Sequence, residues 1–187
     1  MGLFEFLMIL VSVIIGLAIS EILSGVASLL RARESVRTYW IHILFQLGVF
    51  LALVQQWWES WSLVDVQTIS LSEIVLFISQ PVVLYLIAHL LYPRPVAGAD
   101  LDQYYYEQAP VLWSLVVFGT IIGTFVLPLF RNEPLFLASN LSGIPMIVAG
   151  LTLAISRNRT VHSIIAPAIV LMLTLDIWLV NPAISSP

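Results

Sequence analysis

The sequence predicts an all-α integral membrane protein built as a bundle of six transmembrane helices. Hydrophobic residues make up 60% of the 187 residues, charged residues only 10%, and the mean hydropathy is +1.01. Six apolar stretches are each long enough to cross the apolar core of a bilayer, which is about 30 Å thick, as a helix. Positive charges gather in the gaps after the first, third and fifth stretches. Helix is the expected state because hydrocarbon offers no partner for backbone amides.

The six stretches form a single transmembrane domain over residues 1–187. The first run has no basic n-region and is longer than the apolar part of a signal peptide, so we expect it to span the membrane. The longest loop covers 93–110, and we interpret it as a cytoplasmic loop ending in a short interfacial turn. Tyr104, Tyr105 and Tyr106 suit that position, because amphipathic rings settle at the headgroup level. The predicted spans are 3–30, 39–63, 71–91, 111–130, 135–155 and 161–179.

The basic residues predict the orientation, because cytoplasmic loops retain arginine and lysine. All but Arg131 fall on one side of the predicted spans. Both termini are therefore expected to be extracytoplasmic, in a multi-pass protein of the cell membrane that we assign to a bacterial inner membrane. The residues on the cytoplasmic side are Arg31, Arg33, Arg37, Arg94, Arg157 and Arg159.

The composition excludes several kinds of chemistry. The chain has no lysine and no cysteine, which excludes disulfides, thiolate metal sites, cysteine nucleophiles and Schiff bases on lysine. A net charge of -4 without a basic patch argues against nucleic-acid binding. There is no HExxH, GxSxG or glycine-rich phosphate loop, so we do not expect an enzyme, and no cofactor is identified. Partners are to be sought in the lipid bilayer.

Two helices carry small residues at four-residue spacing, which places them on one helix face where another backbone can approach closely. In the fourth span the pattern is a GxxxG. These faces predict helix packing, either within one chain or between copies of a homo-oligomer. The residues are Ser12, Gly16, Ser20, Ser24 and Ser28 in the first span and Gly119 and Gly123 in the fourth.

Glu21 interrupts the first span ten residues before Arg31, hence about 15 Å inside the membrane boundary at 1.5 Å per residue. A charged carboxylate there costs at least about 2.5 to 3.5 kcal/mol, and no arginine lies within a span to pair with it. Gln46 is expected at the same depth, and His42 and Gln56 extend a polar stripe along the second span. We therefore expect these four residues to line a polar pathway.

His42 and His89 lie at matching distances from the cytoplasmic boundary, so contact between the second and third spans is possible. Such a pair could hold a metal or a haem iron. No HxxxH or ExxH spacing accompanies the pair, and a histidine is also easily tolerated at the interface. A proton relay from Glu21 through Gln46 to His42 is a further use of the same residues.

Three hypotheses of function follow from these patterns. The first is an oligomeric channel or transporter for a small cation or a proton, favoured because a glutamate in mid-membrane is costlier than packing requires. The second is a non-catalytic scaffold, assembly or sensory subunit that binds other transmembrane helices through the small-residue faces. The third is a haem-binding or metal-binding membrane protein.

Overall fold

A computed structural model describes residues 2–64, 68–130, 134 and 142–179, and this part of the chain folds into helices. A 3₁₀ turn, η1 (Ser60–Leu63), follows α2, and a π-helical segment, η2 (Ile122–Val126), joins α4 to α5. The α-helices are α1 (Leu3–Arg31), α2 (Trp40–Glu59), α3 (Leu71–Leu90), α4 (Leu101–Ile121), α5 (Leu127–Phe130), α6 (Gly143–Ile155) and α7 (Arg159–Leu179).

The predicted membrane-compatible helical bundle is confirmed for five of the six spans. Five helices are long and apolar enough to cross a membrane: Leu3–Arg31, Trp40–Glu59, Leu71–Leu90, Leu101–Phe130 and Arg159–Trp178. The remaining predicted span, 135–155, is represented by α6, an apolar helix of 13 residues. Residues 135–141 of that span lie outside the described residues. The side of the membrane on which the termini lie remains a prediction.

The predicted loop 93–110 is wrong for its second half, because α4 begins at Leu101 and includes the three tyrosines. The helix starts there because the Asp100 side chain caps it. This carboxylate accepts hydrogen bonds from the backbone N–H groups of Asp102 (2.9 Å) and Gln103 (3.3 Å). The polar composition of this turn suggested a loop, but a capped helix end at the interface accommodates the same residues.

Pro110 lies inside α4 and lacks the N–H that would bond to the carbonyl of Tyr106 one turn earlier. That carbonyl accepts a hydrogen bond from the Arg157 guanidinium instead, in the turn between α6 and α7. Arg157 therefore replaces a missing bond of the α4 backbone, and the helix continues through the proline.

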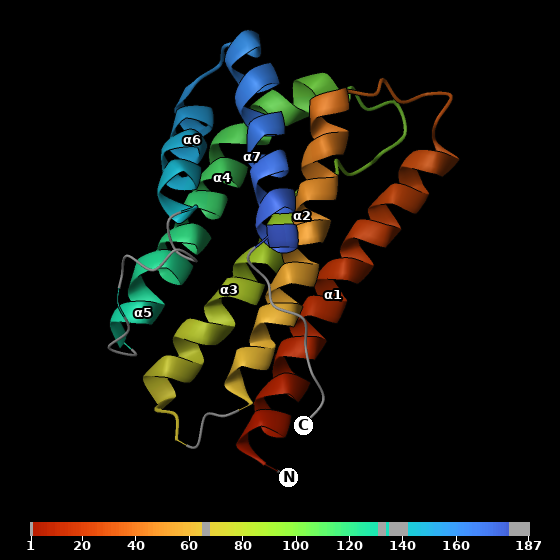
Figure 1. The fold of residues 1–187 in the computed structure, drawn as a ribbon. Helices are drawn as coiled ribbons and strands as arrows, with labels where there is room; N and C mark the ends of the chain where they lie inside the picture. The colour runs from red at the N-terminus through yellow and green to blue at the C-terminus, as the bar shows by residue number, and fades with distance from the viewer. Residues whose placement is uncertain (1, 65–67, 131–133, 135–141, 180–187) are drawn as a thin grey trace.

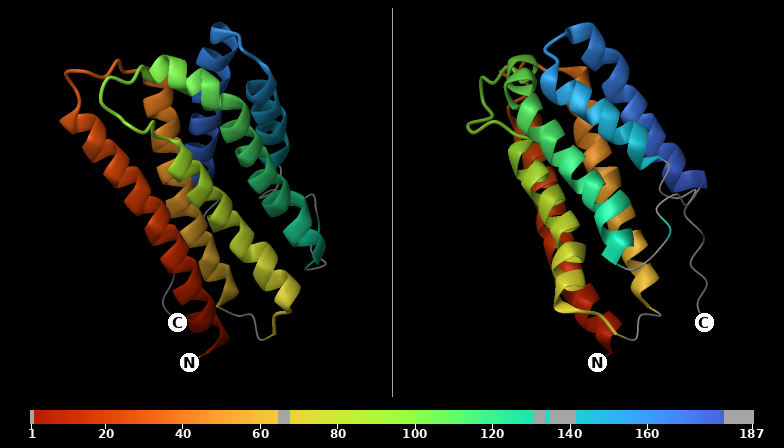
Figure 2. Two further views of the ribbon diagram at one scale, coloured as in Figure 1. Left: turned by 180° about the vertical axis from the view of Figure 1, so that it is seen from behind. Right: turned by 90° about the vertical axis from the view of Figure 1, so that its left-hand side faces the viewer.

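The long helices pack side by side in a bundle, with α1 along one edge and α6 at the other (Figure 1). Each helix contacts the next in the spatial order α1, α3, α4, α6, α7, α2, and α2 contacts α1 again. The views from behind and from the side show the same arrangement (Figure 2). Because α2 also contacts α3 and α4, it is the most enclosed of the long helices.

Close helix approach occurs where glycine leaves room for a larger side chain. A Cβ atom on Gly25 of α1 would lie 2.3 Å from the ring of Tyr92, and one on Gly123 would lie 2.2 Å from the Gln80 amide nitrogen. A Cβ on Gly119 would lie 3.4 Å from Val83 of α3. The glycine face of the fourth span thus lies against α3 of the same chain.

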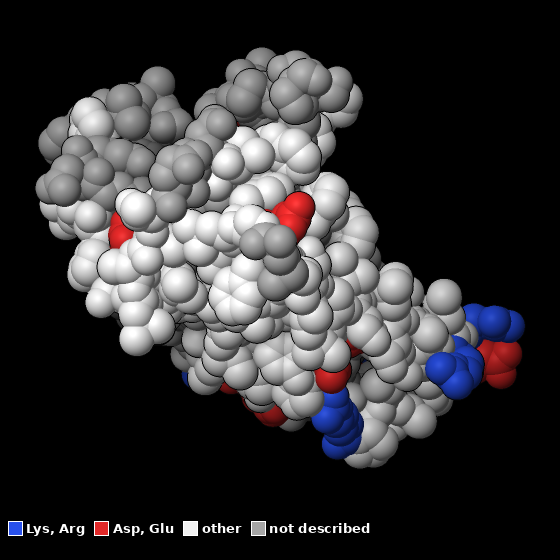
Figure 3. Space-filling view, turned by 90° about the horizontal axis from the view of Figure 1, so that it is seen from below, with Lys and Arg blue, Asp and Glu red and all other residues white. Residues whose placement is uncertain are grey.

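The described arginines gather at one end of the bundle, around the turns 32–39, 91–100 and 156–158 at the top of Figure 1. From the opposite end the described surface is mostly uncharged, with a few acidic side chains, and arginine appears only towards the margin (Figure 3). The sides of the bundle expose large apolar residues such as Leu17, Ile43, Val82 and Ile164. Such a surface suits contact with lipid.

Candidate functional site

The enclosed face of α2 carries polar residues near both ends and apolar residues between them. At about 100° per residue, positions 42, 46, 49, 53 and 56 lie within about 40° of His42 around the helix axis. All five side chains are buried, and Ser60 continues the row one turn later. We call this row the α2 buried face; it consists of His42, Gln46, Val49, Leu53, Gln56 and Ser60.

His42 is fully buried, and neither of its ring nitrogens has a hydrogen-bond partner with ordinary distance and angle. The ring stands edge-on to those of Tyr104 and Tyr105, each with its centroid 6.0 Å away, and interacts with the backbone of Leu91. A neutral imidazole offers one donor and one acceptor. Leaving a buried polar group unsatisfied costs about 1–3 kcal/mol, so a small polar species at this position would be stabilised.

Gln46 lies one turn after His42 and is 5% exposed. Its amide nitrogen is buried without a hydrogen-bond partner. His42 and Gln46 therefore present unused hydrogen-bonding capacity on the same face of α2. A water molecule could accept from the Gln46 amide, and the free nitrogen of a neutral His42 could accept a hydrogen bond or a proton.

Val49 and Leu53 separate this polar pair from the other half of the α2 buried face. Both are buried, Leu53 completely. The ten residues from Gln46 to Gln56 correspond to about 15 Å at 1.5 Å per residue. The middle of the face is thus an apolar stretch in which a charged species would lose its hydration.

Polar side chains resume at the far end of α2. Ser60 donates to the Gln56 carbonyl at 2.7 Å. At the same end of α2 but on another face, the Gln55 amide donates to Glu59 (2.8 Å) and to Asp176 of α7 (3.0 Å). Two carboxyl groups bridged by one amide make this end acidic, which attracts cations.

A second buried network lies at the arginine-bearing end, and sequence reasoning missed it. Tyr105 accepts a hydrogen bond from the Trp113 indole (3.2 Å) and shares one with His162 Nδ1 (2.9 Å). His162 Nε2 lies 2.9 Å from the Ser156 carbonyl, which can only accept. Nε2 therefore carries a proton, and a neutral His162 accepts at Nδ1 from Tyr105. Tyr105 and His162 are 57 residues apart in the sequence, so no local pattern predicts the hydrogen bond between them.

Glu21 does have an arginine partner, contrary to the sequence expectation. Its carboxylate lies 3.1 Å from the Arg94 guanidinium and 3.3 Å from His89 Nδ1. Arg94 follows α3 and reaches back to α1, which span boundaries alone did not suggest. No hydrogen bond joins Glu21 to Gln46, so the relay from Glu21 through Gln46 to His42 lacks its first contact.

His42 and His89 have different surroundings. The His42 ring is fully buried against two tyrosine rings. In contrast, 39% of the His89 side chain is exposed, and its ring lies beside Tyr85 and Glu21. Among the residues that the structure describes, no three His, Asp or Glu side chains come together as a metal site. The two histidines thus have different environments, and their joint role as a ligand pair stays a prediction.

The small-residue row of α1 faces outward. Ser12, Gly16, Ser20 and Ser24 are exposed, Ser28 is half-buried, and no atom would lie within 4 Å of a Cβ on Gly16. The inward face of α1 consists of apolar side chains, together with Gly25. These are Leu7, Val11, Ile15, Ala18 and Ile22.

Comparison with known proteins assigns the chain to no family. No family model, no curated protein and no solved structure matches it. Its function is therefore inferred from the placement of its own side chains.

Proposed function

We propose that the protein is a channel or transporter that moves protons or a small cation along the α2 buried face. The observation that supports this is the division of that face. His42 and Gln46 at one end and Gln56 and Ser60 at the other flank an apolar middle. A path with polar ends and a dry centre resembles a pore closed by a hydrophobic constriction, which gates by excluding water.

The charge pattern favours a cation or proton over an anion. Each described arginine lies at a helix end or in a turn, so none lies along the α2 buried face. An imidazole nitrogen can accept a proton, and an amide oxygen can coordinate a cation. Glu59 and Asp176 raise the local cation concentration at the far end.

Flux through the apolar stretch provides the test. In liposomes containing a pH-sensitive dye or a cation indicator, Val49→Ser should increase flux severalfold, because a hydroxyl helps water enter the constriction. Gln46→Leu should decrease flux below wild type. Val54→Ser is the matched control, since Val54 lies on the same helix but is 43% exposed.

The proposal is wrong if wild-type, V49S and V54S liposomes all leak like protein-free liposomes. Equal increases in V49S and V54S would also contradict it, because they would show a general loss of bilayer integrity. Circular dichroism and gel filtration of each variant confirm that it is folded before reconstitution.

A non-catalytic subunit that binds another transmembrane helix is the second candidate, and the outward α1 row supports it. Gly16 offers open space for a neighbouring backbone, from a second copy or from a partner. Gly16→Leu should then abolish self-association or co-purification while the isolated chain stays folded. Unchanged association in this variant, measured by light scattering in detergent, would exclude this use of α1.

A further inference from the structure

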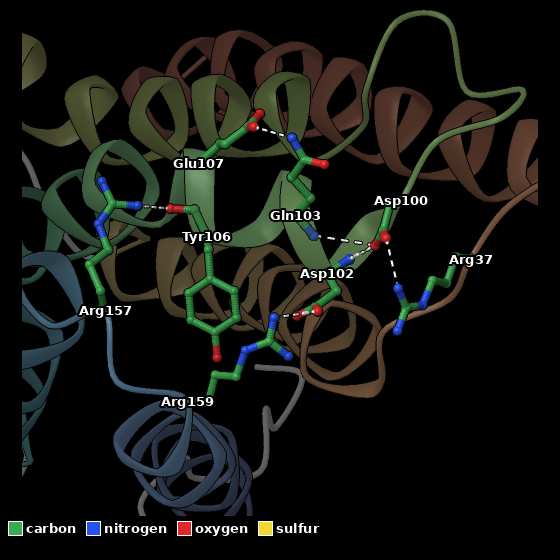
Figure 4. Close-up of a pocket in the computed structure, with 8 residues that line it drawn as sticks. All are labelled: Arg37, Asp100, Asp102, Gln103, Tyr106, Glu107, Arg157 and Arg159. Carbon is green, nitrogen blue, oxygen red and sulfur yellow. Dashed lines mark hydrogen bonds and ion pairs between the residues drawn. The ribbon is translucent and has the colours of Figure 1, made fainter.

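The arginine-bearing end contains a pocket of about 410 Å³, open to the surface and independent of the α2 buried face. It lies between the turn before α2, the first turns of α4 and the turn between α6 and α7 (Figure 4). Its volume is in the range of small-molecule sites, which is about 300–1,000 Å³. Charged residues of both signs line it, so the ligand must be recognised through charge.

Two arginines of the pocket already have carboxylate partners. Arg37 lies 3.1 Å from Asp100, and Arg159 lies 2.7 Å from Asp102. Backbone hydrogen bonds between the Arg37 segment and Ala99 and Leu101 hold the first pair in place. Within each pair the two charges neutralise each other, and the pairs hold the walls of the pocket in place.

The remaining two charges lack opposite partners among the described residues. Arg157 donates to the neutral carbonyl of Tyr106, and Glu107 accepts from the Gln103 amide at 2.8 Å. One positive and one negative group thus face a single pocket without neutralising each other. A ligand that carries both charges would complement them.

Asp102 supplies a second, independent indication of a ligand. Its residue is 8% exposed, and although one carboxylate oxygen binds Arg159, the other is buried without a hydrogen bond. A buried carboxylate oxygen without a donor costs about 1–3 kcal/mol or more. Because this oxygen is covered, a donor in the pocket would reach it only after the Asp102 side chain rotates.

We propose that this pocket binds a zwitterion composed of a phosphate and a primary ammonium. Arg157 and the free N–H groups of Arg159, which lies over the Tyr106 ring at 5.4 Å, would hold the phosphate. Glu107 would accept from the ammonium, and Asp102 would join it after a rotation that uncovers its unpaired oxygen. The same chemistry occurs in an ethanolamine phospholipid headgroup and in free phosphoethanolamine.

Binding to the purified full-length protein in detergent tests the assignment. The probes are dihexanoyl phosphatidylethanolamine, dihexanoyl phosphatidylglycerol and free phosphoethanolamine, measured by titration calorimetry. We expect Arg157→Gln to weaken binding of the ethanolamine lipid about tenfold, as for loss of a charge-assisted contact. Glu107→Gln should remove the preference for ethanolamine over glycerol. Arg33→Gln and Glu34→Gln, exposed and outside the pocket, are the matched controls.

The three probes also identify the source of the ligand. Equal affinity for the lipid and for free phosphoethanolamine indicates a soluble ligand, whereas binding of the lipid alone indicates a headgroup at the membrane surface. The assignment is overturned if wild type binds neither ethanolamine probe, or if R157Q and E107Q bind them like wild type. Ion flux is not the readout, so this result is independent of the proposed permeation path.

Discussion

Helices α1 and α2 both carry a row of polar or small residues at helical spacing, yet the two rows face in opposite directions. The row on α1 is exposed at Ser12, Gly16, Ser20 and Ser24. The row on α2 is buried from His42 onward. Spacing therefore identifies residues that share a face but does not decide whether that face lies inside the bundle.

Hydrogen bonding explains why the row on α1 can face lipid. A serine hydroxyl can donate to the carbonyl one turn earlier, as Ser28 does to Ser24 at 2.9 Å, so it can face lipid without an unsatisfied donor. An imidazole or a primary amide cannot satisfy both its donor and acceptor groups in this way. Apolar residues gain little by leaving lipid, so close packing largely decides which face is buried, and His42 and Gln46 retain unsatisfied polar atoms inside the bundle.

The largest expected effect contrasts two glycines of α1. Gly25→Ala should lower the free energy of unfolding by about 1–3 kcal/mol, because the new methyl group overlaps the buried Tyr92 ring. Gly16→Ala should leave it unchanged or raise it by up to about 1 kcal/mol, through helix propensity. Unfolding in detergent micelles measures both. Equal destabilisation by the two variants would contradict the outward orientation of Gly16.

His42→Leu tests the buried row. Because neither ring nitrogen has a hydrogen bond of ordinary geometry, leucine should raise the free energy of unfolding by about 1 kcal/mol while it decreases flux. Gain of stability with loss of transport is expected where a polar group is kept for function. A loss of more than about 1 kcal/mol would instead indicate that His42 has a structural partner.

Ser20→Ala tests the exposed row, where the effect should be smaller still. We expect a change in the free energy of unfolding within about 0.5 kcal/mol, as for surface positions in general. Ser60→Ala in the buried row is the comparison, since it removes the 2.7 Å bond to Gln56 and should destabilise more. Equal effects of the two substitutions would remove the distinction between the rows.

The Arg37–Asp100 ion pair, which joins the turn between α1 and α2 to the start of α4, should have the smallest effect on stability, and only at acid pH. Desolvation raises the pKa of Asp100, but the N–H groups of Gln103 and Asp102, together with Arg37, outweigh it and lower the pKa below the ordinary 3.8. Asp100 therefore stabilises the fold above its unfolded pKa, and this contribution is lost as pH falls through the lower folded value.

Arg37→Gln should reduce the acid-induced decrease in melting temperature, because the folded pKa of Asp100 then moves back toward 3.8. Melting curves between about pH 5 and pH 3 in detergent would show it. Arg33→Gln serves as the control. If both variants have the wild-type pH profile, Arg37 makes no contribution to the titration of Asp100.

Sequence patterns predicted the helical membrane bundle because length and hydropathy are properties of each segment alone. The start of α4 was missed, since Asp100 caps a helix whose first turn is polar. The partner of Glu21 was missed for another reason: Arg94 lies 73 residues away and reaches it only through the packing of α1 on α3. The burial of His42 and Gln46 likewise depends on helices that the stripe itself does not specify.

Pro110 in α4 also determines where the positive charge of Arg157 lies. Since Pro110 cannot donate to the Tyr106 carbonyl, that oxygen anchors Arg157, and with it the connection from α6 to α7. A defect in the hydrogen-bond ladder of one helix thereby becomes the attachment point that sets the geometry of a neighbouring turn.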